Sequence, residues 1–409
     1  MPATAVIGAQ WGDEAKGKIV HLLAREAQVC VRFNGGPNAG HTVTDALGTA
    51  RLHLVPSGAL YPHCLGVIGH GVVVDPWALE GELGELKAQG RSQPRLFLSE
   101  RCHLILPHHR VLEEEEGTAA RLGTTRRGVG PAYTERTARQ GLRLADLRHP
   151  AHVRERLEEL ARRGGGFDPH AVARELSQFW EGWSSSIGDG QGLIGEALDR
   201  GEHVVFEGAQ GTLLDLDFGT YPYVTSSTTT VHGVGWGTGV RVELDRVVGV
   251  TKAYTTRVGE GPFPTEDHGA VGEWLRRKGN EYGATTGRPR RCGWLDLVAL
   301  RYAHRLNRFS ELALTKLDVL SGLEEVKICT SYRVGGRRVE DFPATVEELA
   351  QAEPIYQTLR GWKEELARAR SPEELPERTR AFLTWVENAV GVKIRWVSVG
   401  PGTDDVIVL

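Results

Sequence analysis

Short runs of apolar, β-branched residues alternate along the chain with stretches that carry apolar residues at helical spacing. In the first hundred residues this pattern predicts strands at 4–8, 28–33, 65–75 and 95–99. It predicts helices at 17–27 and 76–89, and Asp75-Pro76 has the form of an N-cap followed by proline at the first helical position. Such alternation is typical of an α/β fold with a large, mostly parallel central sheet flanked by helices.

The same alternation returns after residue 200, with predicted strands at 203–207, 247–252, 311–315 and 393–399 and predicted helices at 294–307 and 372–390. Residues 150–200 are mostly helical in pattern and polar, and glycine clusters interrupt them. We therefore expect one α/β domain over 1–409, with a helical insertion at 150–200.

Composition and charge exclude several classes of protein. The 49 Lys and Arg nearly balance the 53 Asp and Glu, so no overall basic field favours nucleic acid or an anionic membrane. No stretch reaches 18 apolar residues, and the chain runs directly into a strand rather than a signal peptide. The five scattered cysteines contain no C-x-x-C pair, which fits neither a disulfide framework nor a zinc site. We expect a cytoplasmic protein.

The run from Gly12 to Lys18 follows a predicted strand and has the Gly-x4-Gly-Lys spacing of a phosphate-binding loop. Ile19 stands where Ser or Thr normally holds Mg²⁺, so a bound metal needs another oxygen ligand, and Asp13 is the nearest carboxylate. The alternative is a simple glycine turn between a strand and a helix.

A second strand-to-loop junction at 34–42 is dense in glycine and leads to His41. Glycines let main-chain groups approach a ligand closely, and a protonated His41 beside a phosphate could neutralise charge on a leaving group or donate a proton. A histidine that only caps a turn is the alternative.

The apolar run 311–315 leads to Lys316, Leu317 and Asp318, so that Thr-Lys-x-Asp follows a strand. An aspartate can accept both edge donors of guanine, N1–H and N2–H₂, while the lysine stem packs on the purine. A strand-end turn is the alternative, but together with the phosphate loop the motif favours GTP over ATP.

Four further loops carry hydroxyl, amide or guanidinium groups among glycines, which suits more than one anionic substrate. Each alone could be a solvated loop. They are 123–131 with Arg139 after it, 206–212, 221–227 and 283–291. The acidic run 113–116 is expected to be a solvated helix face.

These motifs resemble the adenylosuccinate synthetase family along essentially the whole chain. The matching stretches are 10–14, 38–42, 53–58, 206–214, 221–227, 284–290 and 315–318. The resemblance implies a fold related to P-loop NTPases and a GTP-dependent ligase. Such enzymes join IMP and L-aspartate to adenylosuccinate through 6-phosphoryl-IMP, with release of GDP and phosphate, in the first committed step of AMP synthesis from IMP.

The resemblance also implies roles for individual residues. Asp13 would be the general base, His41 the acid, and Asp13 with the Gly40 carbonyl would hold Mg²⁺. GTP contacts would be Gly12, Asp13, Glu14, Ala15, Lys16, Gly17, Lys18, Gly40, His41, Thr42, Arg290, Lys316, Leu317, Asp318, Ser398, Val399 and Gly400. IMP contacts would be Asp13, Glu14, Ala15, Lys16, Asn38, Ala39, Gly40, His41, Thr125, Arg139, Gln210, Thr225 and Arg288. Aspartate contacts would be Ala284, Thr285, Thr286, Gly287, Arg288, Pro289 and Arg290. Arg139 would reach into the partner subunit of a homodimer.

The chain departs from the family pattern at a few positions. Ala15 replaces a usual glycine in the first loop, Pro37 a polar residue and Gln140 an arginine, and the tail after Gly400 is altered and ends early. Two other functions share some of the features: a regulatory GTPase, which would need the missing hydroxyl after Lys18, and an RNA- or nucleotide-binding module that uses the arginine loops.

Overall fold

The computed structural model describes residues 3–115, 122–163, 166–283 and 287–409. Its centre is a ten-stranded sheet in which every neighbouring pair is parallel except β19 and β20 at one edge. The strand order is β20 (Val406–Val408), β19 (Ile394–Ser398), β15 (Glu311–Thr315), β11 (Arg246–Lys252), β1 (Ala3–Gly8), β10 (Val204–Glu207), β2 (Val29–Arg32), β5 (Leu65–Ile68), β7 (Leu96–Ser99) and β9 (Ile187–Gly188). The predicted fold class is confirmed.

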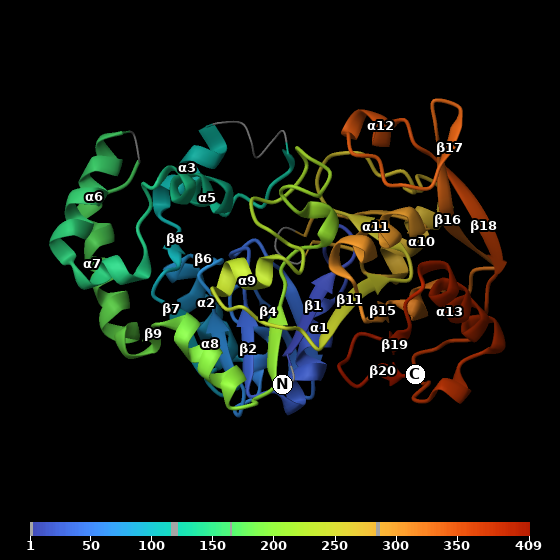
Figure 1. Ribbon diagram of the computed structural model, residues 1–409, viewed down its shortest axis with the longest axis horizontal. Coiled ribbons are helices and arrows are strands. Elements are labelled where there is room, and N and C mark those ends of the chain that lie inside the picture. Colours follow the sequence, from blue (N-terminus) through green and yellow to red (C-terminus); the bar gives the residue numbers. More distant parts are fainter. Residues whose placement is uncertain (1–2, 116–121, 164–165, 284–286) are drawn as a thin grey trace.

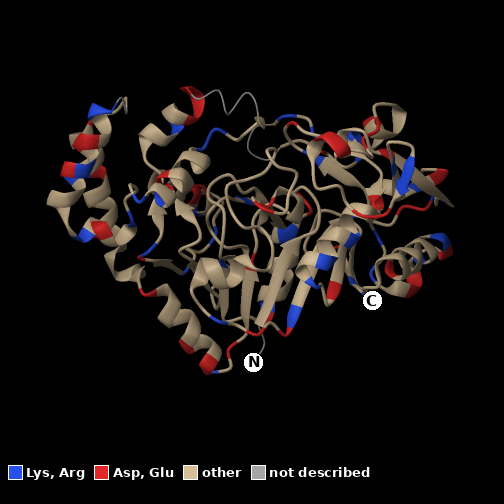
Figure 2. Ribbon diagram, turned by 45° about the horizontal axis from the view of Figure 1, so that its top comes forward, with Lys and Arg blue, Asp and Glu red and all other residues tan. Residues whose placement is uncertain are grey.

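Helices flank this sheet and extend to one side of it, where α6 and α7 lie at the far end of the molecule from β16–β18 (Figure 1). The helices are α1 (Lys16–Leu23), α2 (Pro76–Ala88), α3 (Pro107–Glu115), α5 (Val129–Ala138), α6 (Pro150–Arg162), α7 (Pro169–Trp183), α8 (Gly190–Asp199), α9 (Gly233–Thr238), α10 (Ala270–Lys278), α11 (Leu297–Asn307), α12 (Val346–Ala350) and α13 (Glu377–Val390). Lys, Arg, Asp and Glu are interspersed over the outer helices (Figure 2), in keeping with the balanced charge.

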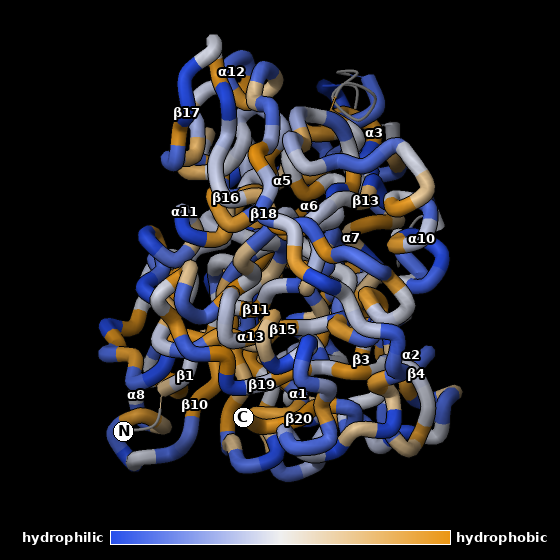
Figure 3. Tube along the Cα trace, turned by 90° about the vertical axis from the view of Figure 1, so that its right-hand side faces the viewer, coloured by the Kyte–Doolittle hydropathy of each residue, from blue (hydrophilic) through white to orange (hydrophobic). Residues whose placement is uncertain are grey.

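The strands of the central sheet form where the sequence has its apolar runs. All six residues of β1 are buried, and so are all four of β2 and of β10, as expected for strands covered on both faces. The hydropathy trace runs hydrophilic at the β17 hairpin and more hydrophobic around β11 and β15 (Figure 3). The predicted strands at 4–8, 28–33, 95–99, 203–207, 247–252, 311–315 and 393–399 are confirmed within one or two residues.

The expectation of one strand over 65–75 is wrong. The backbone forms β5, turns at Gly69–Gly71, and continues as the short β6 (Val73–Val74), which pairs with β8 (His103–Leu104) outside the central sheet. A methyl group at Gly71 would lie 2.0 Å from the Phe33 carbonyl oxygen, so close backbone contact replaces strand pairing here.

Residues 150–200 are mostly helical as predicted, but the segment also contributes β9 to the edge of the central sheet. The division of the chain into one domain with an insertion at 150–200 stays a prediction.

The described residues form four smaller sheets as well. One pairs β3 (His41–Asp45) with β4 (Gly48–Leu52), and another pairs β12 (Thr255–Arg257) with β13 (Arg291–Gly293). A four-stranded sheet contains β14 (Leu295–Asp296), β16 (Glu325–Val334), β17 (Arg337–Val339) and β18 (Glu353–Arg360). The fourth is the β6–β8 pair. Among the described residues, no helix is both long and apolar enough to cross a membrane.

Helix α2 begins as the sequence predicts, since the Asp75 carboxylate accepts a hydrogen bond from the Ala78 backbone N–H at 3.0 Å and Pro76 is the first helical residue. The other carboxylate oxygen of this buried aspartate pairs with Arg110 of α3. One side chain therefore caps α2 and ties it to α3.

We predict that Asp75→Ala lowers the free energy of unfolding by about 2 kcal/mol, since it removes both an N-cap worth ~1 kcal/mol and the hydrogen bond from Arg110 to the buried carboxylate. Asp168→Ala is the matched control, because Asp168 caps α7 through the His170 N–H but is exposed. It should cost only ~1 kcal/mol. Urea unfolding of both variants is the measurement, and an equal loss in both would contradict the dual role of Asp75.

Candidate active site

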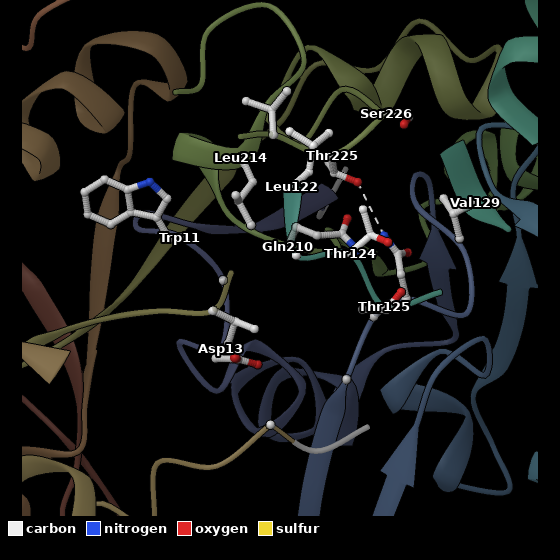
Figure 4. Close-up of a pocket in the computed structure, with 18 of the residues that line it drawn as sticks. Trp11, Asp13, Leu122, Thr124, Thr125, Val129, Gln210, Leu214, Thr225 and Ser226 are labelled. Carbon is white, nitrogen blue, oxygen red and sulfur yellow. Dashed lines mark hydrogen bonds between the residues drawn. The ribbon is translucent and has the colours of Figure 1, made fainter. Parts of the chain in front are cut away.

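A large cavity opens where the loops leave the carboxyl ends of the central strands. Its volume is about 650 Å³, and residues from the loops after β1, β2 and β10 line it together with parts of 122–134, 223–226 and 257–260. Figure 4 shows Asp13, Thr125, Gln210 and Thr225 around the same space. Loops at the carboxyl ends of parallel strands are where α/β proteins bind ligands.

The fully buried Glu14 fixes the conformation of the loop after β1. Its carboxylate accepts hydrogen bonds from the backbone N–H groups of Gln10 (3.0 Å) and Gly12 (2.9 Å) and pairs with Lys16 Nζ at 2.6 Å. Glu14 thus shapes the loop from within, while Asp13, Ala15 and Lys16 line the cavity.

Three residues with left-handed backbone angles lead this loop into α1. Gly12 (φ 86°), Asp13 (φ 61°) and Ala15 (φ 67°) all have left-handed backbone angles, and Ala15 is the N-cap residue of α1. The glycine that the family usually has at position 15 would adopt this angle without cost, whereas the alanine methyl strains it.

Asp13, the predicted base, is paired with a cation in this structure. One carboxylate oxygen lies 2.8 Å from Arg290 Nε, and Arg290 NH1 lies 2.5 Å from the buried carboxylate of Glu281. Burial alone would raise the pKa of Glu281, but Lys252, Lys316 and Arg290 outweigh it and lower that pKa to about 2. Glu281 is therefore a fixed negative charge that holds Arg290 beside Asp13.

His41 is oriented by a second buried carboxylate. Its Nδ1 bonds to Glu207 at the end of β10, and Glu207 also accepts the backbone N–H and the hydroxyl of Ser57, both at 2.7 Å. The opposite ring nitrogen, Nε2, is buried, has no partner and belongs to a residue that lines the cavity. Gly17 permits this packing, because a Cβ there would lie 2.8 Å from the Cβ of His41.

His41 and Glu207 each shift the pKa of the other. Burial lowers the pKa of His41, and the charge of Glu207 opposes that effect. Burial would raise the pKa of Glu207, but His41, Arg32 and Ser57 lower it to about 2. The imidazole is thus coupled to a permanent negative charge on its far side.

Other buried polar atoms in residues that line the cavity have no partner in the protein. Both amide atoms of Gln210 are unpartnered, and so is Asn38 Oδ1, although Asn38 Nδ2 donates to Thr225 Oγ1 at 3.4 Å. Because buried polar groups are normally hydrogen-bonded, these atoms indicate a polar ligand. Asn38, Gln210 and Thr225 were all predicted as IMP contacts.

Glu113 corrects the expectation that 113–116 is a solvated helix face. Glu114 and Glu115 are exposed, but Glu113 is buried, lines the cavity, and accepts hydrogen bonds from the Thr124 hydroxyl and from Gly128 N–H at 2.7 Å. Glu113 therefore shapes the turn that presents Thr125 to the cavity.

The Thr-Lys-x-Asp stretch lies at the end of β15. Asp318 has a buried carboxylate oxygen, Oδ1, without a partner, and burial raises the pKa of this group. Lys316 adopts φ 62° and donates to the Gly279 carbonyl oxygen at 2.6 Å, and the Leu317 side chain is buried in the core. An unpartnered buried acceptor at Asp318 fits a ligand with edge N–H donors.

The predicted residues fall into three groups. Those that line the cavity are Gly12, Asp13, Ala15, Lys16, Gly17, Asn38, Ala39, Gly40, His41, Thr42, Thr125, Gln210, Thr225 and Arg288. Those that lie outside the lining are Glu14, Lys18, Arg139, Gly287, Pro289, Arg290, Lys316, Leu317, Asp318, Ser398, Val399 and Gly400. Ala284, Thr285 and Thr286 lie outside the described residues.

Two groups offer metal ligands. Asp13 and Gly40 both line the cavity and supply a carboxylate and a carbonyl oxygen, the hard donors that Mg²⁺ prefers, so the residues fit this ion. His108, His109 and Glu135 also lie together, but both imidazoles bond to Glu135, at 2.8 and 3.0 Å. His109 Nδ1 accepts the Leu106 N–H, so the neutral ring carries its proton on Nε2, where a metal would bind. This second group is a hydrogen-bonded tie between α3 and α5.

Comparison with known proteins identifies the family. The family model for adenylosuccinate synthetase matches residues 5–407. The chain belongs to the adenylosuccinate synthetase family. It is 51% identical to the adenylosuccinate synthetase of Desulforudis audaxviator, over 100% of this chain and 98% of that protein.

Solved structures agree with this assignment. A fully ligated adenylosuccinate synthetase from Plasmodium falciparum superposes with a TM-score of 0.94 at 38% identity and covers 99% of both chains. A succinoaminodeoxyadenylate synthetase from cyanophage S-2L shares the fold, with a TM-score of 0.65 at 20% identity over 99% of this chain and 94% of that one.

Membership in the adenylosuccinate synthetase family decides between the functions considered from the sequence. The chain is a ligase that joins IMP and aspartate to adenylosuccinate in purine synthesis, and it is not a regulatory GTPase. The RNA-binding alternative is set aside with it.

Sequence reasoning missed three carboxylates at this site. Glu113 was assigned to the surface, Glu207 was noted only as a neighbour of Gln210, and Glu281 was not considered. The sequence did contain a signal for Glu207, which ends an apolar strand. A charged residue at such a position is rarely buried without a partner. Glu281 has no such signal, because it lies outside any apolar strand run and its partners Arg290 and Lys252 are 9 and 29 residues away.

We predict that Ala15→Gly raises the free energy of unfolding by roughly 0.5–1 kcal/mol. The left-handed angle costs an alanine about 1–2 kcal/mol, and the greater entropy of glycine in the unfolded chain offsets only part of that cost. Ala24→Gly is the control. Ala24 follows α1 with an ordinary φ of −72°, so glycine at this position should lower the free energy of unfolding. Urea unfolding that shows Ala15→Gly to be less stable than the unchanged protein would contradict this account.

Proposed function

We propose that the chain ligates IMP and L-aspartate at the expense of GTP, with Asp13 as general base and His41 as general acid. One observation carries the proposal: the Asp13 carboxylate and the unpartnered Nε2 of His41 belong to neighbouring loops that line one cavity. The unpartnered amide of Gln210 in the same lining supports purine binding there.

In the first step Asp13 removes the N1 proton of IMP. This raises the electron density on O6, an otherwise weak nucleophile, which then attacks the γ-phosphorus of GTP and releases GDP. One oxygen of the Asp13 carboxylate is paired with Arg290, and we expect the N1–H group of IMP to replace that partner when the purine binds. Arg290, still held by Glu281, is then available to another anion.

His41 acts on the opposite side of the transferred phosphoryl group. As imidazolium it would donate from Nε2 toward the oxygen between the β- and γ-phosphorus atoms, where negative charge develops. Glu207 favours this charged form and keeps Nδ1–H directed away from the cavity.

The second step forms the C–N bond. The amine of aspartate attacks C6 of 6-phosphoryl-IMP, phosphate leaves, and the amine loses a proton. Arg288 and Arg290 carry the guanidinium groups that suit the aspartate carboxylates, as the resemblance implies. Asp318 would accept the guanine edge of GTP through its unpartnered oxygen.

Asp13 and the Gly40 carbonyl would hold Mg²⁺ in this cavity. When bound, the ion supplies neutralisation of phosphate charge during transfer.

Reconstitution with GTP, IMP, aspartate and Mg²⁺ tests the function. Adenylosuccinate, GDP and phosphate should form in equal amounts, and omission of any one component should stop GDP release. GDP release without IMP would contradict the proposed coupling.

We predict that Asp13→Asn lowers kcat by at least ~100-fold, the usual scale for loss of a general base. The amide keeps the size of the side chain but cannot take the N1 proton. Steady-state kinetics give kcat, and a thermal unfolding curve controls for folding. Near-normal turnover in a folded Asp13→Asn variant would exclude the role.

For His41 we predict a shift in pH dependence. Glu207→Gln removes the charge that raises the pKa of His41, so the imidazolium form, and with it kcat, should be lost at a lower pH on the alkaline side. Ser57→Ala is the matched control, because it removes a hydrogen bond to Glu207 but leaves the charge. Profiles of kcat against pH that coincide for Glu207→Gln and the unchanged enzyme would contradict the coupling.

We also propose a homodimer in which Arg139 completes the site of the partner subunit. Arg139 is exposed, lies at the C-terminal end of α5 and is outside the cavity of its own chain, which suits such a role. A cytoplasmic location is proposed as well, since all five cysteines are free and buried thiols.

We predict that inactive Arg139→Leu, mixed with inactive Asp13→Asn, recovers up to about one quarter of full activity, because half of the subunits form hybrid dimers with one intact site. Activity after subunit exchange is the measurement, and native mass spectrometry verifies the exchange. No recovery despite hybrid dimers would contradict a shared site.

A further inference from the structure

Lys18 occupies the position of the phosphate-binding lysine in the Gly-x4-Gly-Lys pattern, yet its side chain leads elsewhere. The residue is 3% exposed and lies outside the cavity lining, whereas Lys16, two residues earlier, lines the cavity. The P-loop pattern therefore does not describe what this ammonium group does.

The Lys18 ammonium group is surrounded by oxygen atoms of the 398–405 turn. Its Nζ lies 2.8 Å from Ser398 Oγ, 2.8 Å from the Gly400 carbonyl oxygen and 3.5 Å from the Asp405 carbonyl oxygen. An ammonium group has three hydrogens, so these three acceptors account for all of its donors. None is left for a phosphate.

The turn that Lys18 holds follows β19, next to β15, whose end carries Asp318. Asp318 is near enough to Lys18 for their charges to interact. A second hydrogen bond joins the end of β15 to the phosphate loop. The Thr315 hydroxyl donates to the Glu14 carbonyl oxygen of that loop at 2.9 Å. Lys18 thus ties helix α1 to the 398–405 turn, and Thr315 ties the start of the Thr-Lys-x-Asp stretch to the phosphate loop.

The turn also has hydrogen bonds of its own, since the Gly400 carbonyl oxygen accepts from Ser398 Oγ at 3.1 Å and the Asp405 carbonyl oxygen from the Val399 N–H at 2.9 Å. Without the amine, the turn keeps these bonds but loses its direct hydrogen bonds to the Lys18 side chain of α1. The side chain of Asp405 shapes the same turn by accepting Gly402 N–H at 2.8 Å.

We propose that Lys18 is a positioning residue for guanine recognition, which holds the 398–405 turn against α1, and that it is not a phosphate ligand. This inference rests on the proposed use of GTP and assigns a different role to one predicted GTP contact.

The test is the affinity of Lys18→Met for GMP, GDP and GTP, measured by titration calorimetry. A positioning role predicts that all three affinities fall by the same factor, about 10- to 100-fold, the scale of hydrogen bonds to a charged group. A phosphate ligand predicts a loss that grows from GMP to GTP, and that result would overturn the proposal. Unchanged affinity for all three would overturn it too.

Ser398→Ala is the second variant, and it keeps the inference testable should Lys18→Met fail to fold. It removes one partner of Lys18 without touching α1, and it should give a smaller loss that is again equal for the three nucleotides. The double variant should lose less than the sum of the two singles, since both remove one interaction. If the unchanged protein itself binds no guanine nucleotide, the proposed function fails rather than this inference.

Discussion

The Glu207 carboxylate is the contact on which the rest of the site depends. Glu207 is the last residue of β10, in the middle of the central sheet. Its carboxylate bonds to His41 of β3 and accepts hydrogen bonds from the backbone N–H and the hydroxyl of Ser57. A carboxylate buried this deeply is stable only when its oxygens are fully hydrogen-bonded. Its partners are therefore fixed in direction, and the free nitrogen of His41 is directed to one place.

Other buried carboxylates around the cavity also hold backbone groups or side chains in fixed positions. Glu14 gathers backbone N–H groups under the phosphate loop, Glu113 holds the turn before α5, and Glu281 holds Arg290. Each fixes the conformation of a loop or the position of a side chain near the cavity. Asp13 differs, because its carboxylate lines the cavity and its partner Arg290 comes from a separate loop, and the proposed role as a base requires substrate to replace that partner.

Much of this arrangement follows from the sequence. The strand runs, the Asp75 cap and the order of the loops could be predicted because they depend on local pattern, and parallel strands bring their carboxyl ends to one edge. The break between β5 and β6 could not, since it depends on backbone contact between Gly71 and the distant Phe33. The burial of Glu113 and the hydrogen bonds of the Lys18 side chain could not be predicted for the same reason. Their partners, Gly128 and the 398–405 turn, are set by tertiary packing, while an acidic run and a P-loop pattern are local signals.

The most direct test of the central claim is a crystal structure with IMP and a non-hydrolysable GTP analogue bound together. The account predicts the Asp13 carboxylate about 3 Å from N1 of the purine, no longer paired with Arg290, and His41 Nε2 facing the oxygen between the β- and γ-phosphorus atoms. A structure with both nucleotides in the cavity, in which Asp13 keeps its pair with Arg290 and faces away from the purine, would contradict it.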